Sequence, residues 1–156
     1  MDGQPYVWST EFENVHSLWR YREPSLHING SSYPCSEDFY HAQKPIPFNA
    51  SEWDTQKVAV MRKAVHAKLA ADPSLVPLLL ATGSHPLLAL KNDTFWGFHP
   101  RYGGENMLAK LWEELRASLL AKSKQANDRK EDDDEEAEDE ETVFLNLSTS
   151  TATSTT

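Results

Sequence analysis

The sequence predicts an α+β fold: a mainly helical single domain with a few short strands, followed by a disordered C-terminal tail. Three observations lead to this prediction. A chain of 156 residues is long enough for one ordinary domain. Apolar residues recur at helical spacing over residues 51–71 and 105–122, whereas strand-like runs are short. The C-terminal residues are acidic and then rich in Ser and Thr, a composition that does not form a core.

The net charge of −9 originates in one stretch, residues 128–141. This stretch holds 11 acidic and 2 basic residues, so the charges of residues 1–127 balance. Like charges at that density repel each other, and few apolar side chains offset the entropy of the chain. We therefore predict a folded domain over residues 1–124 and a disordered tail over residues 125–156. The acidic tail does not exclude a nucleic-acid partner for the domain.

Several classes of protein lack their sequence signatures here. The single Cys35 excludes a disulfide framework and a four-thiolate metal site, and no two histidines have the i, i+4 spacing of a zinc site. There is no phosphate loop, dinucleotide fingerprint or GxSxG motif. No apolar run approaches the ~20 residues of a membrane span, and the first residues lack a signal-peptide pattern. We expect no metal, no cofactor, no membrane partner and a cytoplasmic location, with the nucleus as the alternative.

The first predicted elements are a hairpin and a helix. Residues 26–28 alternate as a strand does, and the Asn-Gly pair at 29–30 tolerates the positive φ angles of a tight turn. A helix follows over residues 36–44, with Ser36 as its N-cap. Pro45 ends this helix, because a residue that precedes proline is pushed out of helical geometry.

The remaining predicted elements are helices joined by loops. An apolar stripe with steps of three and four residues runs through a helix over residues 51–71. A shorter helix starts near Pro73, which suits the first helical position, and reaches Ala81. Residues 86–90 are apolar and few, so a strand and a buried loop both stay open. A loop rich in glycine and aromatic residues then leads to the last helix, residues 105–122.

The helix over residues 36–44 carries polar side chains on one side. Glu37 and Lys44 are seven positions apart, which places them within about 20° of each other around the axis and roughly 10 Å apart along it. Tyr40 and His41 lie between them on the same side. One interpretation is a capped amphipathic helix with a solvated Lys44. The other places Lys44 in a pocket, where burial disfavours the charged ammonium and leaves a nucleophilic amine, and gives Glu37 the proton transfers.

A second candidate site lies around the start of the last helix. The loop contains Asp93 and the pair Trp96-Gly97, and Gly104 directly precedes the helix. Exposed N–H groups at a helix start suit phosphate, glycine lets a ligand approach the backbone, and the face of a tryptophan suits a base or sugar. The alternative interpretation is an ordinary turn and a core tryptophan.

Taken together, these segments resemble the NADAR family, which is associated with NAD and ADP-ribose metabolism. The resemblance spans about residues 17–120 and rests on motifs in a fixed order: E-x-x-Y-x-A-Q-K at 37–44, M-R-K-A at 61–64, N-D-x-x-W-G at 92–97 and G-x-N at 104–106. Membership implies an N-glycosidase. Activities in the family divide between removing ADP-ribose from guanine in modified nucleic acid and cleaving early intermediates of riboflavin biosynthesis.

The resemblance also implies roles for individual residues. The family's catalytic lysine corresponds to Lys44, which would attack the anomeric carbon of the ribose and form an imine, and its glutamate corresponds to Glu37. The implied substrate-binding residues are Trp96, Asn106, Asp93, Gly97, Gly104, Tyr40 and Arg20. Arg20 lies in a stretch that departs from the family pattern, so it is either a phosphate ligand or a surface arginine.

The leading hypothesis is therefore a monomeric, cofactor-free N-glycosidase whose partner is the ADP-ribose moiety of modified guanine in DNA or RNA. Hydrolysis of riboflavin intermediates is the alternative reaction, and a module that binds ADP-ribose without cleaving it is the alternative class of protein. The chain is short between Lys44 and Met61, and Leu88 stands where relatives often have a glutamate. The wall that selects the substrate is expected to differ from that of many relatives.

Overall fold

The structure is a computed structural model that describes residues 8, 10–13 and 25–150, with side chains up to Arg129. The chain forms two compact units, Met1–Ala117 and Ser118–Thr156. Within the described residues, helices accompany a two-stranded antiparallel sheet, which confirms the predicted α+β class. The first unit holds the elements that build the site, and the predicted domain boundary after residue 124 stays a prediction.

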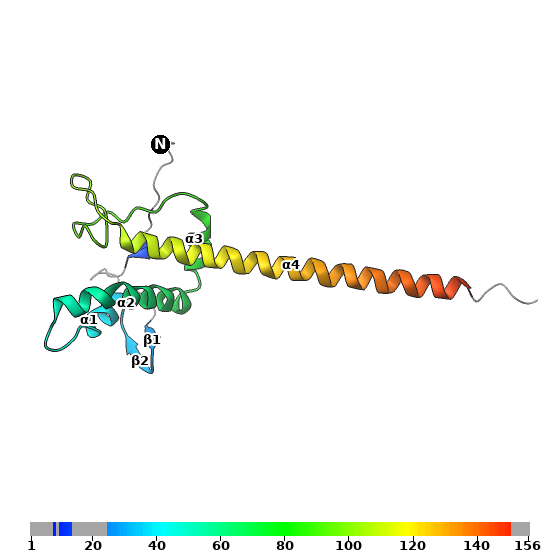
Figure 1. Cartoon of the computed structure of the whole chain (residues 1–156), viewed down its shortest axis with the longest axis horizontal. Coiled ribbons are helices and arrows are strands. Elements are labelled where there is room, and N and C mark those ends of the chain that lie inside the picture. Colours follow the sequence, from blue (N-terminus) through cyan, green and yellow to red (C-terminus); the bar gives the residue numbers. More distant parts are fainter. Residues whose placement is uncertain (1–7, 9, 14–24, 151–156) are drawn as a thin grey trace, which may run out of the picture. The chain divides into compact units, whose positions relative to one another are not determined.

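Strands β1 (Leu26–Ile28) and β2 (Ser31–Tyr33) form the hairpin that the sequence predicts. The turn residues Asn29 and Gly30 have φ angles of 54° and 80°. An Asn-Gly pair adopts this left-handed geometry with little strain, which explains why the hairpin closes there. The alternate side chains of β1 are buried, and the strand packs against helix α2 (Ala50–Ala71; Figure 1).

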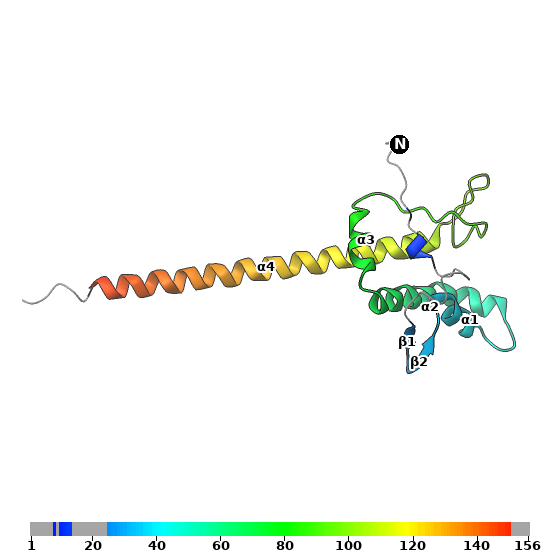
Figure 2. The same ribbon diagram turned by 180° about the vertical axis from the view of Figure 1, so that it is seen from behind.

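Helix α1 (Ser36–Ala42) differs from the predicted helix at both ends. Its N-cap is Cys35, whose backbone is extended, whereas Ser36 is already helical and fully buried. The helix ends before Gln43, so Lys44 lies beyond the last turn instead of within it. Helix α1 packs on α2 and touches β2, and the ribbon views show these elements side by side (Figures 1 and 2).

Helix α2 agrees closely with its prediction. It begins at Ala50, because Asn49 caps it by accepting a hydrogen bond from the N–H group of Glu52 at 3.2 Å. Within the predicted apolar stripe, Met61 and Val65 are buried. The stripe is the face on which the first unit packs.

Helix α3 (Leu75–Ala81) begins two residues later than predicted. The carboxylate of Asp72 accepts a hydrogen bond from the N–H group of Ser74 at 3.1 Å, so a turn precedes the helix at Pro73. Gly83 has a φ of 57° and closes the segment, as expected.

The length and apolar character of the helices bear on whether any of them could span a membrane. In the part of the chain that the structure describes, no individual helix is long and apolar enough to cross a bilayer. Helices α2 and α3 meet the criterion of length and composition together, but the chain bends by 113° between them.

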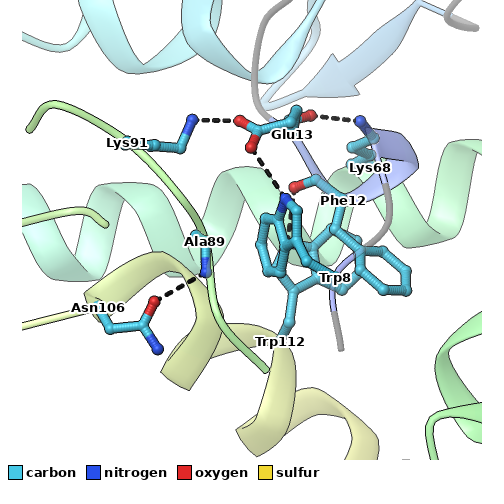
Figure 3. Close-up of polar contacts among 8 residues, drawn as sticks. All are labelled: Trp8, Phe12, Glu13, Lys68, Ala89, Lys91, Asn106 and Trp112. Atoms are coloured by element: carbon cyan, nitrogen blue, oxygen red, sulfur yellow. Dashed lines mark hydrogen bonds and ion pairs between the residues drawn. The ribbon is translucent and has the colours of Figure 1, made fainter. Parts of the chain in front are cut away.

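The 3-10 helix η1 (Thr10–Phe12) closes the core of the first unit. Phe12 is fully buried, and its ring centroid lies 4.9 Å from that of Trp112. The indole N–H of Trp112 donates to the backbone oxygen of Phe12 at 3.0 Å, and Trp8 packs edge-on against Phe12 (Figure 3). Aromatic packing and a buried hydrogen bond thus anchor this short segment.

Helix α4 (Met107–Ser150) is longer than predicted, since the sequence indicated an end near Lys122 and a disordered tail from residue 125. In the acidic stretch, the Glu residues, Ala137 and Lys130 have high helix propensity and favour the helical backbone, whereas the five Asp residues do not. A helix without an apolar stripe is marginal in water unless tertiary packing supports it. Disorder of the tail in solution stays a prediction, and residues 151–156 lie outside the described residues.

Candidate active site

A cavity of about 360 Å³ in the first unit brings the chemistry-bearing residues together. Its wall comes from α1, the segment after it, α2 and the loop before α4. The lining residues are Glu37, Tyr40, His41, Lys44, Met61, Lys91, Asp93 and Trp96. Five of the residues predicted for the site are therefore in one wall, among them the proposed nucleophile and proton carrier. The volume lies at the small end of ligand pockets.

The predicted catalytic residues, Glu37 and Lys44, both line the cavity, but they do not lie in one helix as the sequence predicted. Glu37 lies in the first turn of α1, whereas Lys44 follows the end of the helix, and both line the cavity. The carboxylate of Glu37 pairs with Nε2 of His41 at 3.2 Å, one helical turn away. The ammonium of Lys44 lies 5.8 Å from the ring centroid of Tyr40. A carboxylate, an imidazole and an amine thus share one wall.

Tyr40 lines the cavity and packs against two tryptophan rings. Its side chain is 8% exposed, and its ring meets those of Trp53 and Trp96 edge-on, with centroids 5.0 and 5.5 Å apart. Burial raises the pKa of the Tyr40 hydroxyl above its ordinary value, although hydrogen bonds with the side chains of Trp53 and Trp96 lower it in part. The phenol is therefore neutral at physiological pH and acts as a hydrogen-bonding and packing group.

Asp93 holds Trp96 in place. One carboxylate oxygen of Asp93 accepts hydrogen bonds from the N–H groups of Phe95 and Trp96, at 2.9 and 3.0 Å. This is the local turn that aspartate side chains form with the following backbone. Because Trp96 is half-buried in the cavity wall, Asp93 acts on the site partly by fixing the tryptophan.

The helix start that the sequence suggested as a phosphate site is already occupied by the protein. The N–H groups of residues 105–108 donate to carbonyl oxygens of residues 94–97 at 2.7 to 3.1 Å. The N–H group of Gly97 donates to the backbone oxygen of Asp93 at 2.8 Å. These donors are bonded to the protein's own backbone, so the geometry favours the interpretation of this helix start as an ordinary turn.

Gly97 and Gly104 serve the packing of the loop, and their contact with a ligand stays a prediction. A Cβ at Gly97 would lie 2.5 Å from Cβ of Lys91 and 2.6 Å from the backbone oxygen of Ala89. A Cβ at Gly104 would overlap the backbone oxygen of Gly97 and lie 2.8 Å from that of Thr94. Glycine is required at both positions because the backbone strands of the loop approach each other closely.

The side chain of Asn106 has a structural role in the loop. Its amide nitrogen donates to the backbone oxygen of Leu87 at 2.8 Å, and its amide oxygen accepts from the N–H group of Ala89 at 3.0 Å (Figure 3). The side chain does not line the cavity, and Asp93 does not orient it. The predicted contact of Asn106 with ribose or phosphate stays a prediction.

The sequence did not identify three residues of the cavity wall as site residues: His41, Met61 and Lys91. His41 is four positions after Glu37, and this i, i+4 spacing was the available signal. Lys91 precedes Asp93 by two positions and forms an ion pair with Glu13, a partner too distant in sequence to be deduced from spacing. Arg20 lies outside the described residues, so its role stays a prediction.

Comparisons with known proteins agree with this architecture. The model of the NADAR domain matches residues 45–120. The N-glycosidase YbiA of Escherichia coli (strain K12) is 31% identical over 120 residues, which is 60% of this chain and 75% of that protein. The NMR structure of Escherichia coli YbiA superposes with a TM-score of 0.62 at 26% identity, covering 76% of this chain and 86% of that one.

A second group of relatives carries a different name. The chloroplastic riboflavin biosynthesis protein PYRR of Zea mays is 34% identical over 71 residues, 45% of this chain but 11% of that longer protein. The PYRR protein of Arabidopsis thaliana is 32% identical over 80 residues. The match to the NADAR domain begins directly after Lys44, so it covers neither Lys44 nor Glu37, and their catalytic roles stay predictions.

Proposed function

Because the chain belongs to the NADAR family, we propose that it is an N-glycosidase that uses Lys44 as nucleophile and Glu37 as proton carrier. One observation carries this proposal: Lys44 and Glu37 line the same cavity, together with an aromatic wall. The relatives named N-glycosidase support the class of reaction. A protein that only binds ADP-ribose would have no need of a nucleophile in its binding site.

The proposed reaction starts with attack on the anomeric carbon of the ribose. The Nζ atom of Lys44 forms a bond to this carbon, the bond from the carbon to the base nitrogen breaks, and the base leaves with a proton. The pair of Glu37 and His41, 3.2 Å apart, supplies and recovers protons. Opening of the sugar ring gives an imine with Lys44. Water then adds to the imine, which releases the sugar as a free aldehyde and restores the lysine.

The leading substrate is ADP-ribosylated guanine in DNA or RNA. A cavity of about 360 Å³ accommodates the ribose around the reacting carbon, so the rest of a long substrate would extend over the surface. Tyr40 and Trp96 offer aromatic contact to the sugar or the base. Monomeric assembly and a cytoplasmic or nuclear location stay predictions.

Early intermediates of riboflavin biosynthesis are the second candidate substrates. The similarity to the PYRR proteins of Zea mays and Arabidopsis thaliana favours them. They share with the first substrate a base-like amine on a phosphorylated ribose, so the same lysine chemistry applies to both.

The proposal is tested by presenting both substrates to the full chain with borohydride in the mixture. Reduction of the imine should leave a covalent sugar adduct on the parent and on Lys110→Ala, an exposed lysine outside the cavity, but none on Lys44→Ala. Comparison of initial rates on the two substrates selects between them. An adduct on Lys44→Ala equal to that of the parent would refute the imine mechanism. Tight binding of ADP-ribose without cleavage of either substrate would replace the enzyme with a binding module.

A further inference from the structure

Lys91 is a second lysine in the cavity wall, and the proposed reaction does not use it. Its side chain is 26% exposed and lines the same cavity as Lys44. It belongs to the loop between α3 and α4, close to Asp93 and Trp96. A long cationic side chain that is three-quarters buried at a ligand cavity calls for an explanation, since lysines are normally exposed.

The backbone and the stem of Lys91 are fixed in place. Its N–H group donates to the backbone oxygen of Phe98 at 3.3 Å, and that of Phe98 donates to Ala89 at 2.8 Å. The stem lies over Gly97, where an added Cβ would come within 2.5 Å of Cβ and 2.9 Å of Cγ of Lys91. Gly97 of the loop motif, which has no side chain, therefore leaves space for the stem of Lys91.

Glu13 fixes the ammonium group. The carboxylate of Glu13 forms an ion pair with the ammonium of Lys91 and accepts a hydrogen bond from the indole N–H of Trp8 at 2.9 Å (Figure 3). The backbone oxygen of Glu13 accepts from the ammonium of Lys68 at 2.6 Å. Phe12, the preceding residue, is fully buried. Glu13 is thus held on both sides, and it holds Lys91 in turn.

The charges of the cavity wall show what Lys91 contributes. Two carboxylates, Glu37 and Asp93, face the cavity with two lysines. The ammonium of Lys91 offsets one of these two negative charges and so reduces the repulsion that a phosphorylated sugar would meet in the cavity. An ammonium group has three N–H donors, of which the ion pair with Glu13 uses one. Donors therefore remain for an anion in the cavity.

We infer that Lys91 binds the phosphate of a ribose phosphate in the cavity and that Glu13 is a positioning residue for its ammonium group. The inference rests on the proposed function, because it names the part of the substrate that the cavity holds besides the anomeric carbon. Both candidate substrates carry a phosphorylated ribose, so the same subsite would serve either.

Calorimetric titration of the full chain with methyl ribofuranoside 5-phosphate tests the inference without turnover. This probe has no free aldehyde, and its methoxy group leaves far less readily than a base, so Lys44 should not convert it to an imine. Methyl ribofuranoside is its uncharged counterpart. Lys91→Met keeps the apolar stem of the side chain and removes the ammonium group. Its affinity for the phosphorylated probe should therefore be about tenfold lower or more, whereas its affinity for methyl ribofuranoside should be unchanged. Lys91→Arg should retain most of the affinity, and Lys110→Met should match the parent.

The role of Glu13 is tested by a double-mutant cycle. Glu13→Gln keeps the acceptor for Trp8, so it should weaken binding of the phosphorylated probe by a few-fold. The double variant Glu13→Gln/Lys91→Met should bind the phosphorylated probe as tightly as Lys91→Met alone, because Glu13 acts through the lysine. On a cleaved substrate, Lys91→Met should raise KM and leave kcat nearly unchanged, as removal of uniform binding does.

The outcomes separate this inference from the proposed function. Equal affinity of Lys91→Met and the parent for the phosphorylated probe would overturn the subsite, even if the parent cleaves a substrate. Failure of the parent to distinguish the two probes would overturn it as well. Preference for the phosphorylated probe that depends on Lys91, in a chain that cleaves neither substrate, would keep the subsite and refute the N-glycosidase. Melting temperatures of all variants identify any that is misfolded, and Lys91→Gln, which also removes the positive charge, then takes the place of Lys91→Met.

Discussion

Helix α1 and the loop of residues 92–106 both carry polar residues that the sequence marks as candidates for the site, yet they use them differently. The polar side chains of Glu37 and His41 in α1 line the cavity, and Lys44 joins them just after the helix. In the loop, the amide of Asn106 and the N–H groups of residues 105–108 are bonded to the protein's own backbone. In the proposed function, α1 and the residue after it supply the reacting groups, and the loop contributes to the wall that holds them.

Because of this difference, substitutions in the two segments should have different effects on activity and stability. Substitutions in α1 should change the rate constant with little effect on stability, because the affected side chains are partly exposed. Substitutions in the loop should change stability first, because buried backbone groups lose their partners. Activity per folded molecule and free energy of unfolding, measured on the same samples, distinguish the two.

The largest effect is expected for Lys44→Ala. Loss of the nucleophile should lower kcat by at least about a thousandfold, since no other group in the proposed reaction forms the covalent intermediate. Circular dichroism should show an unchanged melting temperature. Turnover within a factor of ten of the parent would assign the chemistry to another residue.

Glu37→Gln should have the next largest effect. The amide preserves the size of the side chain but removes its proton-carrying function, so kcat should fall about a hundredfold. The variant also loses the ion pair with His41, an exposed pair that contributes little to stability. The pH profile of kcat, compared with that of His41→Gln, shows whether the two side chains act as a unit. An unchanged kcat would remove Glu37 from the mechanism.

Asn106→Gly should act on stability instead of rate. Glycine tolerates the φ of 55° at this position, so the variant reports on the two hydrogen bonds to Leu87 and Ala89. Their loss should lower the free energy of unfolding by about 2 kcal/mol, as measured by urea denaturation. Asn92→Gly, in the same loop and exposed, is the control. Full stability together with a strongly raised KM would return Asn106 to the substrate.

The smallest effect concerns Tyr40, where the two segments meet at Trp96. Its pKa is raised in the folded chain, so the unfolded chain ionises first as pH rises. The stabilisation is complete below about pH 10 and decreases as pH rises from there through the folded pKa. Tyr40→Phe should show a weaker decrease above pH 10 in urea denaturation. Ultraviolet titration of the parent and of Tyr40→Phe should show that the phenol missing in the variant ionises above the ordinary pKa of tyrosine.

The parts of the fold that the sequence predicted are those set by local chemistry. The positive φ of Asn29 and Gly30 fixed the hairpin turn, and the apolar stripe fixed helix α2. Glu37 and Lys44 could be paired because seven positions of one short segment separate them. Each of these signals lies within a few turns of chain.

The parts that the sequence did not predict depend on distant partners. An asparagine before a helix has the same local pattern whether its amide meets a ligand or the backbone of residues 87–89, so Asn106 was assigned to the substrate. The ion pair of Lys91 with Glu13 joins residues 78 positions apart, and no spacing rule finds such a pair. The end of α4 was missed because helix propensity and charge repulsion oppose each other in the acidic stretch.

The aromatic cluster at the cavity has an optical consequence. Trp96 is half-buried in the cavity wall beside Tyr40, whereas Trp112 is fully buried in the core. A sugar that displaces water from the indole of Trp96 changes the polarity around this fluorophore and leaves that around Trp112 constant. The protein therefore contains its own emission reporter of occupancy, and Trp96→Phe isolates its signal.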